Sequence, residues 1–314
     1  MPILKMKPAV KDYLWGGDRL KKEWHIETDT EIAAEAWMLS CHPDGPSRVV
    51  NGEYAGRTLA EAIAAMGPTA VGKNVPAGGD FPILIKLIDA RDNLSIQVHP
   101  DDAYAGEHEG QFGKTEMWFI LDAEPGAFLY YGFREEISAT EFRERIRDNT
   151  LLPVLNAVPV KKGDVFFIPP GTLHAIGRGI LIAEIQQSSN VTYRVYDYDR
   201  RDAQGNARQL HIEQALAVTQ RTKPVPQSFD PHIADCAYFT VDRITLNGAA
   251  VDRAGGTVDD HSFLSVLVIG GDGEIGLPGT GELMKITRGD SVFLPAGSGA
   301  WEMTGSVDAL LTRI

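Results

Sequence analysis

The sequence predicts a mainly β protein made of two jelly-roll β-barrels with a few short helices. Short apolar segments, several with period-two alternation, recur between turn residues. The 32 glycines and 18 prolines suit the many tight turns of an all-β fold. One turn–strand–turn motif also occurs twice in the chain. At 314 residues, the sequence has room for one large or two ordinary domains.

The segments expected to be strands are short and bounded by turn residues. They are 34–40, 83–89, 94–99, 115–121, 126–131, 154–160, 164–169, 173–176 and 180–187. We expect irregular structure with short strands for most of residues 1–55, and a loop rich in Gly and Pro at 67–80.

Three segments are expected to be helices, at 58–66, 138–146 and 211–219. Thr58 and Glu61 have the spacing of a capping box, and so do Ser138 and Glu141. A proline-rich linker at 220–235 follows the third helix.

The repeated motif predicts two related barrels. Residues 162–171 read Lys-Gly-Asp-Val-Phe-Phe-Ile-Pro-Pro-Gly, and residues 288–297 read Arg-Gly-Asp-Ser-Val-Phe-Leu-Pro-Ala-Gly. At the same offset, His174 corresponds to Ala300. We therefore expect a metal-binding barrel at 1–219, with an N-terminal extension and short helices, and a degenerate barrel-like β domain at 236–314. The alternative is a chance match between common turn residues.

Composition narrows the class of protein. Hydrophobic residues at 43% and charged residues at 23% are ordinary for a soluble globular protein. No apolar run approaches the roughly 20 residues of a membrane helix, and the N-terminus lacks the apolar core of a signal peptide. Cys41 and Cys236 form no disulfide framework or zinc pair, so we expect a reduced, cytoplasmic protein.

The net charge of −13 argues against a nucleic-acid partner and means that an anionic substrate must meet a local cluster of cations. The sequence leaves the oligomeric state open.

The strongest candidate site begins in the expected strand at 94–99. Ser95, Gln97 and His99 alternate with apolar residues, so these three side chains point to one face. Because the strand lies in an apolar region, we expect this polar row inside a barrel rather than in solvent. Gln97 and His99 could then reach one metal ion.

Two further ligands are expected on other strands, at Glu116 and His174. His174 ends the pattern G-D-x-x-x-x-P-x-G-x-x-H, which is typical of cupin barrels. One carboxylate, two imidazoles and an amide oxygen suit a divalent ion of zinc type with open coordination positions.

Several of these motifs together resemble the type I mannose-6-phosphate isomerases in their short bacterial form. They are 34–37, 42–45, 94–100, 113–118, 170–175 and 190–198. The resemblance implies a double cupin fold with one zinc ion per chain, held by Gln97, His99, Glu116 and His174. It also implies a phosphosugar substrate and the following site residues: Arg194 as the catalytic arginine, Glu184 and Lys114 in the catalytic site, and Ser95 and Lys86 at the substrate phosphate.

The implied reaction interconverts mannose 6-phosphate and fructose 6-phosphate through an enediol, and so needs a base and a cation near the developing oxyanion. Glu184 is the expected base, with His99 or zinc-bound water as rivals. Without the resemblance, Arg194 could be a surface ion-pair residue and Lys86 a strand-end residue, and the direction of Glu184 is ambiguous. Two other hypotheses are an isomerase of another phosphosugar and a non-catalytic cupin that binds or senses a sugar phosphate.

Overall fold

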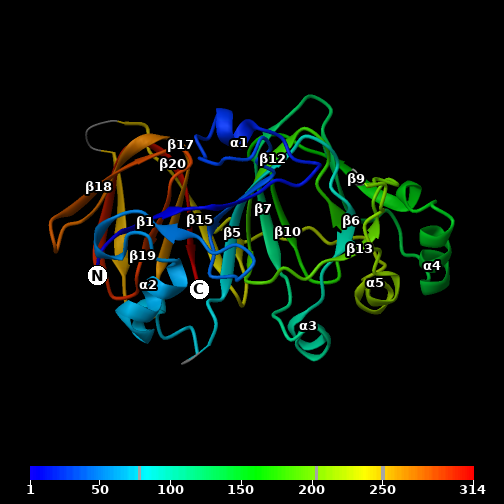
Figure 1. The fold of residues 1–314 in the computed structure, drawn as a ribbon, viewed down its shortest axis with the longest axis horizontal. Coiled ribbons are helices and arrows are strands. Elements are labelled where there is room, and N and C mark those ends of the chain that lie inside the picture. Colours follow the sequence, from blue (N-terminus) through cyan, green and yellow to red (C-terminus); the bar gives the residue numbers. More distant parts are fainter. Residues whose placement is uncertain (77–78, 202–203, 249–251) are drawn as a thin grey trace.

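The computed structural model describes residues 1–76, 79–201, 204–248 and 252–314. Within these residues the fold consists of three antiparallel β-sheets, which we call A, B and C, and a layer of helices. Figure 1 shows these layers side by side, with sheet A at the left, sheet B in the middle, and sheet C and two helices at the right. The prediction of a mainly β fold with a few short helices is confirmed.

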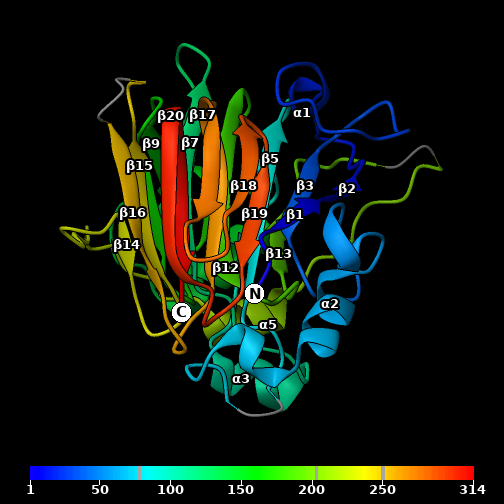
Figure 2. The same cartoon turned by 90° about the vertical axis from the view of Figure 1, so that its left-hand side faces the viewer.

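Sheet A makes up most of the C-terminal half of the chain. Its nine strands in the described part of the chain are β1 (Leu4–Lys7), β4 (Arg48–Val49), β14 (Ala234–Asp235), β15 (Thr240–Thr245), β16 (Arg253–Val258), β17 (Leu264–Leu277), β18 (Glu282–Thr287), β19 (Ser291–Leu294) and β20 (Gly299–Arg313). The long strands β17 and β20 pair along most of their length, as Figure 2 shows in orange and red. Their inner face packs around a core that includes Val266, Val292 and Trp301.

The first residues of the chain join this C-terminal sheet. Strand β1 pairs with β19, and β4 pairs with β1. Strand β14 lies at the end of the expected linker, which is therefore not wholly irregular. The division of the chain at 219 and 236 stays a prediction, and the β1–β19 pairing connects segments from both sides of it.

Sheet B is buried on both faces. Its strands, in spatial order, are β10 (Val165–Ile168), β7 (Glu116–Ala123), β12 (Ile180–Gln187), β5 (Ile83–Ala90), β3 (Glu35–Leu39) and β2 (Ala9–Lys11). Ile85 and Leu87 pack with Phe293 and Leu310 of sheet A, whereas the alternate residue Ile88 faces sheet C. Burial on both faces explains why these strands read as continuous apolar runs rather than as alternating ones.

Sheet C carries the polar row on its inner face. Its strands are β13 (Tyr193–Tyr196), β6 (Ile96–Val98), β11 (His174–Ala175), β8 (Phe128–Phe133) and β9 (Leu155–Pro159). Ile96 and Val98 pack outward, in one core with Phe142 of α4 (Ala139–Arg147) and Ala215 of α5 (Ile212–Val218). Gln97 therefore points inward, toward sheet B, as the alternation predicts.

The remaining helices are short. They are α1 (Arg19–Lys22), α2 (Leu59–Met66) and α3 (Asp102–His108), with 3₁₀ turns at Gly52–Tyr54, Pro68–Val71 and Leu152–Val154. Every helix in the described residues is too short or too polar to span a lipid bilayer.

The two predicted capping boxes differ in outcome. At α2 both reciprocal bonds form: Glu61 N–H donates to Thr58 Oγ1 at 3.2 Å, and Thr58 N–H donates to Glu61 Oε2 at 2.7 Å. At α4, Ser138 Oγ accepts from Glu141 N–H at 3.0 Å, but the Glu141 carboxylate accepts from Arg145 Nε instead. Only one of the two predicted bonds of this capping box therefore forms, because the i, i+4 ion pair with Arg145 competes for the Glu141 carboxylate.

The repeated motif folds in the same way twice. In the first copy Gly163 and Gly171 have φ of +90° and +81°, and in the second Gly289 and Gly297 have +92° and +78°. Each pair of glycines brackets one strand, β10 or β19. The matching left-handed turns explain why glycine occurs at both positions in each copy.

Candidate active site

Strand register brings the predicted site residues together on the inner faces of sheets B and C. On sheet C, Gln97 lies directly opposite His174 on one side and Arg194 on the other. On sheet B, Glu184 lies directly opposite Lys86. Residues opposite each other on neighbouring strands point to the same face. The two rows therefore face each other across the space between the sheets.

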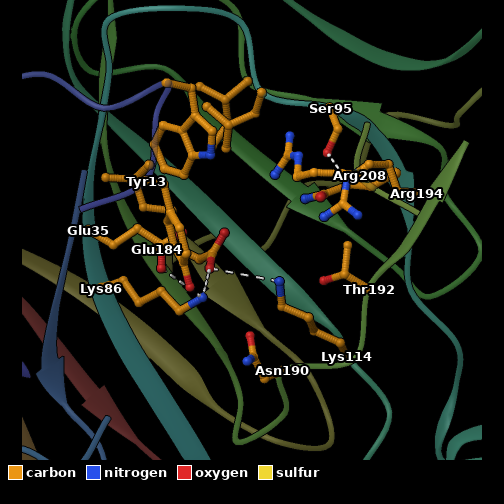
Figure 3. Close-up of a pocket in the computed structure, with 15 residues that line it drawn as sticks. Tyr13, Glu35, Lys86, Ser95, Lys114, Glu184, Asn190, Thr192, Arg194 and Arg208 are labelled. Carbon is orange, nitrogen blue, oxygen red and sulfur yellow. Dashed lines mark hydrogen bonds and ion pairs between the residues drawn. The ribbon is translucent and has the colours of Figure 1, made fainter. Parts of the chain in front are cut away.

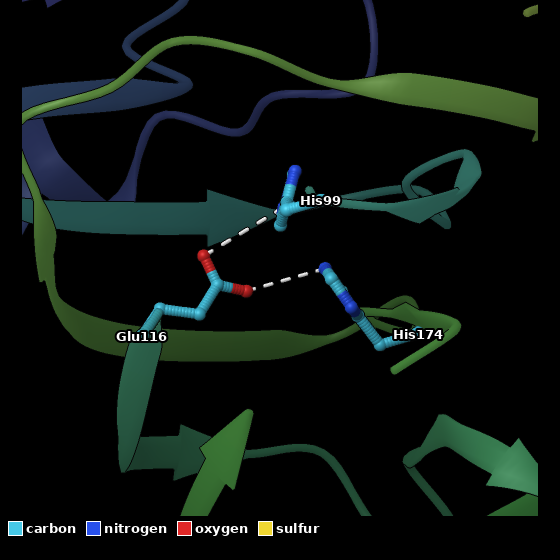
Figure 4. A group of neighbouring side chains, drawn as sticks. All are labelled: His99, Glu116 and His174. Atoms are coloured by element: carbon cyan, nitrogen blue, oxygen red, sulfur yellow. Dashed lines mark ion pairs between the residues drawn. The ribbon is translucent and has the colours of Figure 1, made fainter. Parts of the chain in front are cut away.

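Three side chains meet at the deep end of this space, as Figure 4 shows. His174 Nε2 lies 3.2 Å from Glu116 Oε1, and His99 Nε2 lies 3.8 Å from Glu116 Oε2. The other ring nitrogens, Nδ1 of His99 and of His174, each lie 2.8 Å from a backbone carbonyl oxygen, at Val191 and Thr172 respectively. Because a carbonyl only accepts, each Nδ1 carries the hydrogen and each Nε2 presents its lone pair toward Glu116.

The triad of His99, Glu116 and His174 fits a divalent metal ion. Burial lowers the pKa of His174 to about 4 and holds the pKa of His99 well below its ordinary value. Both imidazoles are therefore neutral at pH 7, the form that binds metal. Both Glu116 oxygens and His174 Nε2 are buried without a hydrogen bond among the described residues. Such acceptors are costly to bury unless a ligand satisfies them.

Lys114 connects the triad to the open part of the site. Its Nζ lies 3.1 Å from His99 Nε2 and 3.9 Å from Glu184 Oε1. It also lies 2.8 Å from Glu116 Oε2, in an ion-pair contact without hydrogen-bond geometry. The ammonium group is buried and sits between two carboxylates.

The sheet B wall is a buried network of two carboxylates around Lys86. Its Nζ lies 3.3 Å from Glu184 Oε1 and 3.6 Å from Glu35 Oε2. Two tryptophans orient these carboxylates: Trp118 Nε1 donates to Glu184 Oε2 at 2.8 Å, and Trp37 Nε1 donates to Glu35 Oε2 at 2.7 Å. The Lys86 ammonium also lies over the Trp37 ring, 5.0 Å from its centroid.

Charge pairing keeps this wall ionised. Burial alone would raise the pKa of Glu184, but the ammonium groups of Lys114 and Lys86 outweigh burial and lower that pKa. Burial alone would lower the pKa of Lys86, but Glu35 and Glu184 raise it overall. The positive charge of Lys86 is therefore already balanced within the protein.

The opposite wall carries arginines. Arg194 Nε donates to Ser95 Oγ at 3.1 Å, and its Nη1 donates to the Gln209 carbonyl oxygen at 3.1 Å. Arg208 lies on the same side of the pocket, as Figure 3 shows, and makes a bidentate pair with Asp197 at 2.7 and 2.6 Å. Figure 3 also shows Glu35, Lys86 and Glu184 across the pocket from these arginines.

A pocket of about 280 Å³ lies between the two walls. This volume is near the lower end of the roughly 300–1,000 Å³ of small-molecule sites. Charged and hydroxyl groups line most of it, with Trp15, Ile88 and Leu94 among the apolar contacts. The pocket therefore suits a small, polar, anionic molecule.

The structure brings every predicted site residue to the triad or to the pocket wall. They are Lys86, Ser95, Gln97, His99, Lys114, Glu116, His174, Glu184 and Arg194. The direction of Glu184, ambiguous in the sequence, is inward. The roles assigned to these residues stay predictions.

Other residues that line the pocket were not predicted as site residues: Tyr13, Glu35, Asn190, Thr192 and Arg208. The sequence pattern could have indicated Glu35, because Glu35 and Trp37 are two residues apart on an expected strand and so share a face. No sequence pattern could have indicated Arg208, because it lies in an irregular segment without periodicity.

Comparisons with known proteins identify the family. Residues 3–120 match the model of the phosphomannose isomerase type I catalytic domain, and residues 231–313 match the model of the mannose-6-phosphate isomerase cupin domain. A mannose-6-phosphate isomerase of Streptococcus mutans is 39% identical over 311 residues, which cover 96% of this chain and 94% of that protein.

Solved structures agree with the sequence comparison. The crystal structure of the mannose 6-phosphate isomerase from Bacillus subtilis has a TM-score of 0.89 and 34% identity, and the match covers 100% of both chains. The apo form of the Salmonella typhimurium enzyme has a TM-score of 0.77 at 18% identity, a likeness that concerns the fold alone. The chain therefore belongs to the mannose-6-phosphate isomerase family, in agreement with the resemblance of its motifs.

Proposed function

We propose that the protein interconverts mannose 6-phosphate and fructose 6-phosphate by proton transfer through an enediol, with the help of one zinc ion. The observation that carries the proposal is a pocket lined by the ionised carboxylate of Glu184 and the guanidinium of Arg194, whose lining residue Lys114 also contacts the metal-type triad. Family membership supports the same reaction, because the similar proteins from Streptococcus mutans and Bacillus subtilis are named mannose-6-phosphate isomerases.

His99, Glu116 and His174 would hold the zinc ion, with Gln97 as a fourth ligand from the adjacent position of sheet C. When bound, such an ion supplies a Lewis acid that polarises a sugar oxygen. The backbone carbonyls of Val191 and Thr172 fix the tautomers of the two imidazoles, so that each Nε2 carries a lone pair instead of a hydrogen.

Glu184 is our candidate for the base that moves a proton between C1 and C2 of the sugar. Its ammonium neighbours keep the carboxylate ionised at neutral pH, which is the form that accepts a proton. Trp118 holds one carboxylate oxygen by a hydrogen bond, whereas Oε1 has ion-pair contacts with Lys86 and Lys114 but no hydrogen bond among the described residues. His99 is a weaker candidate, because its Nε2 is directed at Glu116 and Lys114.

Arg194 would stabilise the negative charge that develops on the enediolate oxygen. Two of its N–H groups are held by Ser95 and Gln209, which fixes the plane of the guanidinium and leaves other N–H groups for the substrate. We retain Ser95 as a phosphate contact. Lys86, in contrast, is better assigned to keeping Glu184 ionised, because its charge is shared by two carboxylates.

A coupled assay of fructose 6-phosphate formation, after zinc is restored, tests this proposal. We expect turnover by the wild-type protein and a kcat/KM lower by about 10²–10³ in Arg194→Ala, the loss typical of a removed oxyanion donor. Full activity in Arg194→Ala would remove the role of that arginine. If mannose 6-phosphate raised the melting temperature of the zinc-loaded wild type without turnover, the sensor hypothesis would replace the enzyme.

A further inference from the structure

Asp197 pairs with two arginines, Arg200 and Arg208, of which Arg208 lines the pocket. Its carboxylate accepts a bidentate pair of hydrogen bonds from Arg208, at 2.7 and 2.6 Å, and further hydrogen bonds from Nε and Nη2 of Arg200. One carboxylate shared by two guanidinium groups leaves an excess of positive charge. Arg194 adds to it, because its side-chain hydrogen bonds in the described residues go to the neutral oxygens of Ser95 and Gln209.

The backbone after β13 is shaped to hold this arrangement. Tyr198 and Asp199 have φ of +57° and +52°, and Arg200 N–H donates to the Asp197 carbonyl oxygen at 3.1 Å. These features define a tight turn of the I′ type, which is unfavourable for residues other than Gly, Asn and Asp at its centre. Arg200 Nη1 also donates to the Asn93 carbonyl oxygen at 2.6 Å, so a hydrogen bond connects the turn to the loop between β5 and β6.

The lysines of the pocket are poor phosphate ligands by comparison. Lys86 is 4% exposed and lies between Glu35 and Glu184, and Lys114 is 4% exposed and lies beside Glu116. A phosphate dianion would have to compete with these buried carboxylates for each ammonium group. Among the described cations of the pocket wall, Arg208 shares its carboxylate with Arg200, and the side-chain hydrogen bonds of Arg194 go to neutral oxygens, so the excess positive charge lies on the arginine side.

Exposure places the arginine cluster at the solvent end of the site. The Arg208 side chain is 37% exposed, whereas those of His99 and His174 are 1% and 0% exposed. A phosphate dianion is expensive to dehydrate, so it is more stable near the mouth, with the reacting sugar carbons directed inward. A sugar phosphate bound in this direction would extend from Arg208, past Arg194, toward the triad.

We propose that Arg208 binds the phosphate group of the hexose 6-phosphate together with Ser95, that Asp197 positions Arg208, and that this contact selects phosphorylated over unphosphorylated sugars. The inference rests on the proposed function, because it assigns one end of the same substrate. It moves the main phosphate contact from Lys86 to Arg208.

Arg208→Gln tests the contact, with kcat/KM measured for mannose 6-phosphate and, at high enzyme concentration, for unphosphorylated mannose. Because Arg208→Gln loses a charged hydrogen-bond donor to phosphate, kcat/KM for mannose 6-phosphate should fall about 100-fold. The fall in kcat/KM for mannose should be much smaller than the fall for mannose 6-phosphate, because mannose has no phosphate for Arg208 to contact. Arg208→Lys keeps the charge but not the bidentate pair. Its kcat/KM for mannose 6-phosphate should therefore lie between those of the wild type and Arg208→Gln.

Arg201→Gln is a matched control on the same loop. Arg201 is exposed, bonds to the Gly205 carbonyl oxygen and does not line the pocket. The Arg201→Gln substitution removes the same formal charge as Arg208→Gln. However, kcat/KM for mannose 6-phosphate should change by less than about threefold, because an exposed charge is screened. Asp197→Asn should raise KM for mannose 6-phosphate much more than it lowers kcat, a split that general loss of structure would not produce.

A second readout does not depend on turnover. Inorganic phosphate should raise the melting temperature of the wild-type protein and of Arg201→Gln, but not that of Arg208→Gln. A folded Arg208→Gln variant with wild-type kcat/KM and wild-type stabilisation by phosphate would overturn the inference and leave the isomerase in place. A wild-type protein that binds phosphate through Arg208 but does not convert mannose 6-phosphate would instead overturn the proposed reaction.

Discussion

Replacement of Lys86 by methionine tests the charge network of the sheet B wall. The Lys86 side chain is 6% exposed and lies within 3.6 Å of Glu35 and 3.3 Å of Glu184. Removing one partner of a buried ion pair costs about 3–5 kcal/mol, because the remaining charge is left uncompensated. Methionine keeps most of the volume and can still pack on Trp37, so the loss should come from charge rather than from a cavity.

The pH dependence of this loss follows from the pKa of Glu184. In the wild type that pKa is below its ordinary value of 4.5, mainly because Lys114 and Lys86 outweigh burial. The ionised group therefore stabilises the fold above about pH 4.5, and this contribution disappears as the pH falls through the lowered pKa. Without Lys86 the pKa of Glu184 rises. The difference in unfolding free energy between wild type and variant should be largest near pH 7 and shrink in acid.

Urea unfolding of the two proteins at pH 7 and pH 4 measures both effects. Lys73→Met is the matched control, because Lys73 also pairs with a carboxylate, that of Asp260, but both side chains are more than half exposed. We expect no measurable loss of stability in the control. A Lys86→Met variant as stable as Lys73→Met at both pH values would refute the buried network as a source of stability.

Two further predictions concern the metal site and the repeated turns. Glu116→Ala should lower the zinc content well below one ion per chain and destabilise the first barrel, and unchanged stoichiometry by elemental analysis would contradict its place among the ligands. Gly163→Ala should cost about 1–2 kcal/mol, because its φ is +90° in open space. Gly289→Ala should cost more in the same urea assay, because its Cβ would lie 2.5 Å from the Trp24 carbonyl oxygen, and equal costs would contradict that contact.

Local patterns explain what the sequence predicts well. The strand β12 at Ile180–Gln187 has the predicted bounds, because turn residues flank a run buried on both faces. The inward direction of Gln97 follows from simple alternation with Ile96 and Val98. The turn glycines that bracket β10 and the position of His174 are likewise local features, so this part of the candidate site could be predicted before any tertiary structure was known.

Contacts between distant segments explain what the sequence does not predict. The network around Lys86 joins β3, β5 and β12, and its charge balance depends on strand order rather than on any local motif. The pairing of β1 with β19 joins the two ends of the chain. Helix α3 was missed for a different reason: Asp101 caps it by accepting from Tyr104 N–H at 2.9 Å, but only Ala105 is buried, so no apolar period marks the helix.

The most direct measurement of the central claim is the rate at which Glu184→Gln converts mannose 6-phosphate to fructose 6-phosphate, at a zinc content equal to that of the wild type. The substitution keeps the shape of the side chain and removes its ability to accept a proton. We predict measurable conversion by the wild type and a kcat lower by about 10²–10⁴ in the variant, the usual contribution of a positioned general base. Conversion at the wild-type rate by Glu184→Gln would contradict the account of the pocket as the place of proton transfer.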